Sequence, residues 1–242
     1  NVPAQSVKEL LANPAVAIVL NLTVPAVHYK VTKQALLAGK HVYSEKPLTL
    51  TMAEAKDLQA IAKRKKLQVA AAPDTFLGGS HQMIRKLIDD GAIGKVASGT
   101  AHILSQGMEH WHPNPDFFFK PGGGPILDMG PYYIANLVNL VGPVKRVAAL
   151  ASTPRKTRMI SSEPRKGQTI TVTTPTTHHA LLHFANGAAI TLSASWDVYA
   201  HRHQPLEIYG TEGAIFVPDP NFFGGEVLMA GTDAVAKPVA LW

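Results

Sequence analysis

Helix and strand patterns alternate over the first 73 residues, and this alternation restricts the possible folds more than any other feature. An apolar run at 15–22, rich in β-branched residues, predicts a strand buried on both faces. Further strands are predicted at 41–44 and 67–72. Helical patterns follow Pro25 and Thr51 and separate the three strands. Strand, helix, strand, helix, strand at this spacing predicts right-handed crossovers and a parallel sheet.

Two helix starts carry a specific signal. Ser6-Val7-Lys8-Glu9 and Thr51-Met52-Ala53-Glu54 both match the capping box, in which a hydroxyl and a glutamate bind each other's backbone N–H groups. Gly39 stands where a glycine commonly ends a helix. These signals predict where the helices of this segment begin and end.

The loops after the first two predicted strands, at 23–25 and 44–47, leave the carboxyl edge of the sheet, where ligands bind in folds of this kind. The second loop contains Glu45-Lys46-Pro47, and Pro47 keeps Lys46 away from helical backbone angles. From its position alone, Lys46 is equally compatible with meeting a ligand and with being a surface lysine before a helix.

After Pro73 the pattern changes. Helices are predicted at 80–90 and 126–140, a strand at 95–104, and a loop rich in proline and glycine at 105–125. The remainder reads mostly as strand. Asn186-Gly187 joins two apolar strands, and Thr211-Glu212-Gly213 joins two more, so consecutive hairpins predict an antiparallel sheet. We therefore expect a second, α+β domain that begins near residue 74.

Two groups of residues in this second part are candidates for chemistry. Asp128 and Tyr132 are four apart on a predicted helix and would share one face of it, just after three consecutive glycines. Considered alone, the pair reads more simply as a helix-start aspartate and a half-buried tyrosine. Trp111-His112 lies in the long loop, where an aromatic ring beside an imidazole suits a sugar. Packing at the domain junction explains that pair equally well.

Composition excludes several kinds of site. There is no cysteine, which rules out disulfides, thiolate zinc sites and thiol nucleophiles and fits a cytoplasmic protein. The net charge is +6, but its densest cluster, 63–66, ends a predicted helix without interleaved aromatic residues, so a solvated helix end is favoured over a phosphate-binding patch. The histidines at 178, 179, 183, 201 and 203 lack carboxylates that would complete a metal site. No apolar run is long enough to span a bilayer.

Four short motifs in order resemble the glucose–fructose oxidoreductase / inositol dehydrogenase family, often written Gfo/Idh/MocA. They are Asn21-Leu22-Thr23-Val24-Pro25 with His28; Ala38-Gly39-Lys40-His41-Val42 leading to Glu45-Lys46-Pro47; Asp90-Gly91-Ala92-Ile93-Gly94-Lys95; and Gly123-Gly124-Pro125-Ile126-Leu127-Asp128-Met129-Gly130. The resemblance covers nearly the whole chain. Each motif is loose by itself, but four at the family's spacing are specific.

The resemblance implies the rest of a Rossmann parallel sheet at 1–74, followed at 75–242 by a substrate-binding and oligomerisation domain with a large, mainly antiparallel open sheet. It implies NAD or NADP as cofactor, with Lys46 as the family's catalytic lysine. The family's helix carries an aspartate, matched by Asp128, and usually a histidine four residues on. Tyr132 stands at that position here, as a tyrosine does in glucose–fructose oxidoreductase.

The implied reaction is hydride transfer between nicotinamide and a sugar or polyol. Lys46 would stabilise charge on the reacting oxygen, Tyr132 would exchange the proton, and Asp128 would bind a neighbouring hydroxyl. Predicted cofactor contacts are Asn21, Thr23, Pro25, His28, Glu45 and Lys46. Predicted substrate contacts are Trp111, His112 and Asp128.

One family feature lies outside the sequence. No G-x-G-x-x-G fingerprint is present, and a preceding segment of roughly 60 residues would be expected to carry it. The chain also ends early for the family. Besides catalysis, the resemblance allows a non-catalytic member that senses a sugar or cofactor. We expect a small-molecule partner and a homo-oligomer formed through the open sheet, without nucleic-acid or membrane binding.

Overall fold

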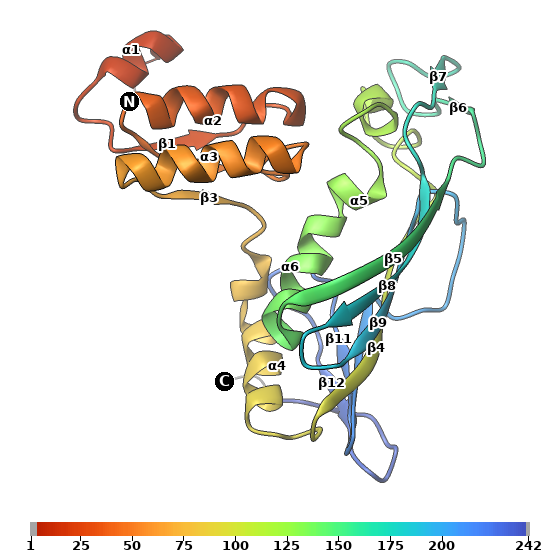
Figure 1. Ribbon diagram of the computed structural model, residues 1–242. Helices are drawn as coiled ribbons and strands as arrows, with labels where there is room; N and C mark the ends of the chain where they lie inside the picture. The colour runs from red at the N-terminus through yellow and green to blue at the C-terminus, as the bar shows by residue number, and fades with distance from the viewer. Residues whose placement is uncertain (1–3, 241–242) are drawn as a thin grey trace. The chain divides into compact units, whose positions relative to one another are not determined.

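The computed structural model describes residues 4–240 and separates the chain into two compact units, one ending at Pro73 and one beginning at Asp74 (Figure 1). The first unit holds a three-stranded parallel sheet in the order β1-β2-β3. These strands are β1 (Ile18–Asn21), β2 (His41–Ser44) and β3 (Val69–Ala71). The parallel sheet predicted from the alternating pattern is therefore confirmed.

The helices of the first unit begin where the sequence signals place them. They are α1 (Val7–Ala12), the 3-10 turn η1 (Pro25–Val27), α2 (His28–Leu37) and α3 (Met52–Lys65). Both capping boxes form: Ser6 and Glu9 bind each other's backbone N–H groups, and so do Thr51 and Glu54. Basic side chains fill the last turn of α3, where they complement the helix dipole.

The core of the first unit lies between the sheet and the helices α2 and α3, which cover one of its faces (Figure 1). Leu36, Leu58 and Val42 are buried there. The prediction that the first strand is buried on both faces is wrong for this chain, because Ile18 and Leu20 are 59% and 64% exposed. An apolar run does not by itself show whether both faces of a strand are covered.

The second unit is built on an eight-stranded sheet in the order β13-β12-β11-β10-β4-β9-β8-β5. Both predicted hairpins form, β8 with β9 and β10 with β11. The pairing of β4 with β9 is parallel and the other pairings are antiparallel. The mainly antiparallel sheet is thus confirmed. Its strands are β4 (Val96–Leu104), β5 (Val144–Ser152), β8 (Thr177–Phe184), β9 (Ala189–Ser195), β10 (Leu206–Gly210), β11 (Ala214–Val217), β12 (Leu228–Ala230) and β13 (Lys237–Pro238).

Helices cover one face of this sheet (Figure 1). Ile84, Leu137 and Leu140 from the helices pack with Ile190 and Ile208 from the strands, and all five are buried. The helical segments are η2 (Thr75–Leu77), α4 (Gly79–Asp89), η3 (Pro115–Phe119), α5 (Pro125–Asp128) and α6 (Gly130–Val141). A separate hairpin consists of β6 (Thr157–Met159) and β7 (Thr169–Thr171).

The single helix predicted at 126–140 is wrong. The structure ends α5 at Asp128 and begins α6 at Gly130, with Met129 between them. Pro131 is the physical reason, because it has no N–H to continue the helical hydrogen bonds. Asp128 therefore ends one short helix, while Tyr132 lies in the first turn of the next.

Candidate active site

In the first unit, the loops after β1 and β2 leave the same edge of the sheet, because Asn21 and Ser44 are partners in the parallel register. Thr23 in the first loop is exposed, and Glu45 and Lys46 in the second are partly exposed. The Glu45 carboxylate accepts a hydrogen bond of 2.8 Å from the Lys46 backbone N–H. The Lys46–Pro47 peptide bond is cis. The structure thus brings the predicted residues of both loops to one edge.

Asn21 has a different environment from the one predicted. Its side chain is 1% exposed. Its amide nitrogen donates to the His28 carbonyl at 3.1 Å and to the Thr32 hydroxyl at 3.0 Å, and its oxygen accepts from the Thr23 hydroxyl at 2.7 Å. These bonds join the end of β1 to α2, so the buried Asn21 side chain stabilises the loop between them.

His28 is also fully buried. Its Nε2 lies 2.7 Å from the Thr23 carbonyl oxygen, and its Nδ1 lies 2.7 Å from the Pro47 carbonyl oxygen. The imidazole therefore bridges the two loops of the sheet edge. The predicted cofactor contacts of Asn21 and His28 stay predictions, and this geometry favours indirect roles for both side chains.

In the second unit, the long loop before α5 carries Trp111 and His112. Trp111 is 56% exposed, and its ring lies edge-on to His112, with 5.3 Å between centroids. The His112 ring also meets Phe118 edge-on at 5.2 Å, and its carbonyl accepts a 2.6 Å hydrogen bond from Ser162. His112 is thus fixed by the protein, while Trp111 offers an exposed aromatic surface.

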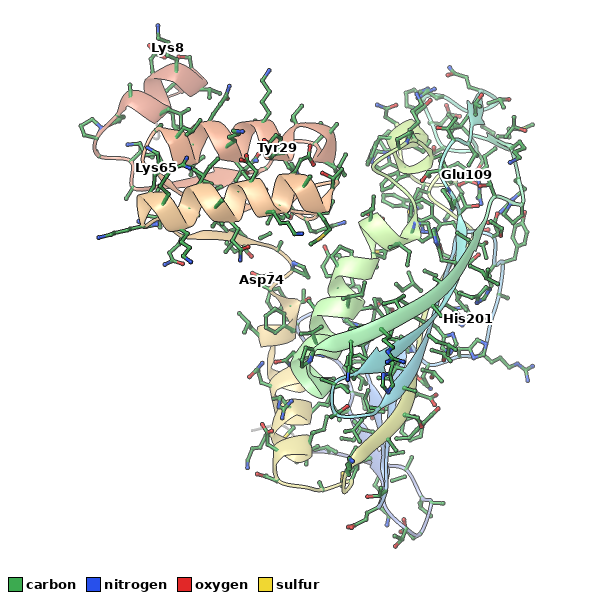
Figure 2. The ribbon with its side chains drawn as sticks, viewed as in Figure 1. Lys8, Tyr29, Lys65, Asp74, Glu109 and His201 are labelled. Atoms are coloured by element: carbon green, nitrogen blue, oxygen red, sulfur yellow. The ribbon has the colours of Figure 1, made fainter. Side chains whose placement is uncertain are left out.

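A buried ionic network supports this loop, and no sequence pattern indicated it. The Arg158 side chain is 1% exposed and bonds to Glu109 and Asp197, each at 2.6 Å. Figure 2 labels Glu109 in the loop that Arg158 of β6 reaches. The partners are 49 and 39 residues apart in sequence, so no local pattern links them.

Asp197 stays ionised in this network despite its burial. Burial alone would raise the pKa of Asp197, but hydrogen bonds from Thr176 and Thr177 and the charge of Arg158 outweigh it. The pKa of the carboxyl is consequently below its ordinary value. Arg158 therefore binds a carboxylate at Asp197 as well as the Glu109 side chain. These charge-assisted hydrogen bonds join the β6–β7 hairpin to the loop.

The predicted catalytic residues divide between the units. Lys46 belongs to the first, and Asp128 and Tyr132 belong to the second. Asp128 follows Gly124, whose φ of +87° and tight surroundings suit glycine. The meeting of Lys46 with Asp128 and Tyr132 stays a prediction.

The described histidines and acidic residues include no group of three or more that could hold a metal ion. His102 and His203 stack with 4.0 Å between ring centroids, and burial together with the neighbouring histidines lowers the pKa of His102. Within the described part of the chain, no helix is long and apolar enough to cross a membrane.

Family models match both units. Residues 1–72 match the model described as oxidoreductase family, NAD-binding Rossmann fold, and residues 81–216 match the GFO/IDH/MocA C-terminal domain. The chain belongs to the GFO/IDH/MocA oxidoreductase family. The resemblance read from four motifs is therefore confirmed, as is the nicotinamide class of cofactor that the Rossmann model describes.

Individual relatives of this GFO/IDH/MocA chain include sugar dehydrogenases. An uncharacterised oxidoreductase of Synechocystis is 28% identical over 221 residues, which are 89% of this chain and 58% of that protein. D-xylose dehydrogenase of Paenarthrobacter nicotinovorans is 28% identical over 151 residues, 60% of this chain and 39% of that enzyme. The structure of levoglucosan dehydrogenase in complex with NADH is 25% identical with a TM-score of 0.79, covering 96% of this chain and 62% of that one.

The chain spans 40 to 58% of the length of three curated relatives. The sheet edge of the first unit nevertheless offers groups that fit the nicotinamide–ribose end of a dinucleotide. Leu22 and Val24 are 71% and 63% exposed and present apolar surface, beside the hydroxyl of Thr23 and the charged groups of Glu45 and Lys46. Such a combination suits a ring and a ribose that meet the carboxyl ends of parallel strands.

Proposed function

We propose that this protein is an NAD- or NADP-dependent oxidoreductase that acts on a hydroxyl or carbonyl group of a sugar or polyol. The observation that carries the proposal is the position of Glu45-Lys46-Pro47, directly after β2, at the edge shared with the loop after β1. Two relatives support the substrate class, since D-xylose dehydrogenase and levoglucosan dehydrogenase are both named for a sugar substrate.

Residues of both units have roles in the proposed reaction. The nicotinamide, when bound, supplies the site that accepts or gives up the hydride. Thr23, Pro25 and Glu45 contact the nicotinamide–ribose half. The Lys46 ammonium donates a hydrogen bond to the reacting oxygen and stabilises the negative charge that develops there.

The substrate side of the proposed site comes from the second unit. Tyr132 exchanges the proton of the reacting hydroxyl, and Asp128 binds a neighbouring hydroxyl and orients the sugar ring. Trp111 and His112 line this side. The first unit is then the dinucleotide-binding domain, and the second binds substrate and mediates self-association through its open sheet. A cytoplasmic location belongs to the same proposal.

The first test compares the Lys46→Ala variant with the wild type, and both are produced as the full gene product. A panel of sugars and polyols that includes D-xylose and levoglucosan is screened by nicotinamide absorbance. Loss of the Lys46 ammonium should lower turnover on the order of 100- to 1000-fold, as removal of a single charge-stabilising donor does. The Kd for NADH should change only a few-fold. Lys8→Ala, on the exposed surface of α1 (Figure 2), is the control and should match wild type.

Three outcomes would oppose the proposal in different ways. Near-normal turnover of Lys46→Ala removes Lys46 from the mechanism. Loss of NADH binding in that variant makes Lys46 a binding residue. Wild-type protein that binds NADH and a sugar but converts none of the panel supports the non-catalytic sensor instead.

A further inference from the structure

His28 occupies a position that its predicted role as a cofactor contact does not explain. The side chain is 0% exposed, and both ring nitrogens face backbone carbonyl oxygens, Thr23 O and Pro47 O, at 2.7 Å. Pro47 directly follows Lys46. The imidazole is therefore a side-chain link between the loop after β1 and the loop that bears the proposed catalytic lysine, beside the backbone bond of 2.8 Å from the Glu45 N–H to the Asn21 carbonyl.

The hydrogen-bond chemistry of this link is unusual. A carbonyl oxygen can only accept, and a neutral imidazole has one N–H donor and one bare nitrogen. With one bare nitrogen, a lone pair would face a carbonyl oxygen at 2.7 Å. Both contacts are hydrogen bonds only when each ring nitrogen carries a proton.

His81 in the second unit provides the comparison. It is also 0% exposed and has a partner at each nitrogen. Its Nε2 lies 2.9 Å from the Phe222 carbonyl oxygen, but its Nδ1 lies 3.0 Å from the Asn136 side-chain nitrogen, which donates. One acceptor and one donor suit the neutral ring. The chain thus contains two buried histidines whose surroundings require different numbers of ring protons.

We propose that His28 is a positioning residue whose doubly protonated ring clamps the Thr23 and Pro47 carbonyls together and so fixes the backbone from which the Lys46 side chain extends. Asn21 supports this clamp, since its amide nitrogen donates to the His28 carbonyl at 3.1 Å and its amide oxygen accepts from the Thr23 hydroxyl at 2.7 Å. The charged residues on the segments joined by the ring are Lys30 and Lys33 of α2, and Glu45 and Lys46 beside Pro47. The two carbonyl oxygens are the partners that call for an N–H at each ring nitrogen.

The role of the clamp rests on the proposed function, but its first test does not. In wild-type protein labelled with ¹⁵N at histidine, NMR should show both His28 nitrogens protonated and only one His81 nitrogen protonated. The backbone amide signal of Lys46 should move in His28→Phe, which keeps the ring volume and removes both donors. Tyr29→Phe is the control, because Tyr29 is the next residue of α2 and its hydroxyl donates to Asp57 at 2.9 Å (Figure 2). The Lys46 amide signal should not move in this variant.

The second test measures catalysis. His28→Phe should lower kcat about 10- to 100-fold with a change in KM and NADH Kd of less than about 3-fold, because misplacing a catalytic group by about 1 Å costs rate on this scale. His28→Gln, which keeps side-chain N–H donors, should recover part of the loss. This variant and the wild-type ring spectrum keep the proposal testable if His28→Phe does not fold.

A bare nitrogen on His28 in wild type would overturn the proposal, and so would an unmoved Lys46 amide signal in His28→Phe. Equal kcat values for wild type and His28→Phe would overturn the positioning role. Full turnover by Lys46→Ala, in contrast, would remove the proposed catalytic lysine while both NMR results still stood, so the two failures are distinguishable.

Discussion

At the scale of single residues, His81 shows how burial sets a charge state. Its ring joins α4 to the segment at Phe222 and to Asn136 of α6. Burial lowers the pKa of His81, although the Phe222 carbonyl and the charge of Asp219 act in the opposite direction. The folded protein therefore holds this histidine neutral, whereas the unfolded chain protonates it near pH 6.5.

The sign of the pH dependence follows from that difference. The folded pKa is below the unfolded one, so the contribution of His81 to stability is complete above about pH 6.5 and is lost as the pH falls below it. His81→Gln should consequently lose less stability than wild type between about pH 7.5 and pH 5.5. Urea unfolding followed by tryptophan fluorescence measures this, since Trp111 and Trp196 lie in the second unit. The exposed His110→Gln is the control, and a slope in His81→Gln equal to that of wild type would refute the prediction.

At the scale of elements, the β6–β7 hairpin is fixed by two arginines in contrasting surroundings. Arg158 in β6 is 1% exposed, reaches Glu109 and Asp197 and lies over the Phe119 ring, 4.9 Å from its centroid. Arg165, which follows β6, pairs with Asp116 but keeps a side chain that is 28% exposed. Breaking a fully buried pair leaves a charge without compensation, whereas the charges of a pair that water still reaches are partly solvated when the pair is broken.

The hairpin therefore offers a matched pair of variants. Arg158→Leu should lower the free energy of unfolding by about 3–5 kcal/mol, because Glu109 and Asp197 would lose their buried cation. Arg165→Leu should lower it by about 1 kcal/mol or less. Denaturant unfolding of both variants checks the difference. Equal losses would mean that the buried network is not what stabilises the hairpin and the loop it supports.

At the scale of the whole molecule, one face of the eight-stranded sheet carries exposed apolar side chains that the proposed reaction does not explain. Leu150 of β5 and Leu181 of β8 are 81% and 56% exposed. They border a hollow of about 450 Å³ that includes Thr191 of β9. Contiguous apolar surface of this kind commonly marks a contact with another protein. The proposed homo-oligomer would bury it against a second copy.

Charge placed on this face should disrupt self-association. Leu150→Lys combined with Leu181→Lys should shift the protein to a smaller species in sedimentation velocity, because two cations per copy would have to be desolvated on association. Val235→Lys is the control, because Val235 is 53% exposed and lies between β12 and β13, at the other end of the strand order. A wild-type protein that sediments as a monomer at every concentration would remove the oligomer from the proposal.

The sequence by itself determined the elements whose cause is local. The capping boxes at Ser6 and Thr51, the hairpin turn at Asn186-Gly187 and the strand–helix alternation each depend on residues that are close in the chain, so their patterns predicted them correctly. The family motif around Lys46 is local for the same reason. The broken helix at Met129 was local as well, since Pro131 was visible, but the apolar periodicity concealed it.

Only the tertiary structure decided what depends on distant partners. The burial of one face of β1, the parallel pairing of β4 with β9 and the ionic contacts of Arg158 join segments that no short pattern connects. The same holds for His28: its motif marked it as a candidate, but the two carbonyl oxygens behind its proposed role belong to loops that precede and follow it in the chain. A periodic pattern records which residues avoid water, whereas hydrogen-bond partners are set by the path of the folded backbone.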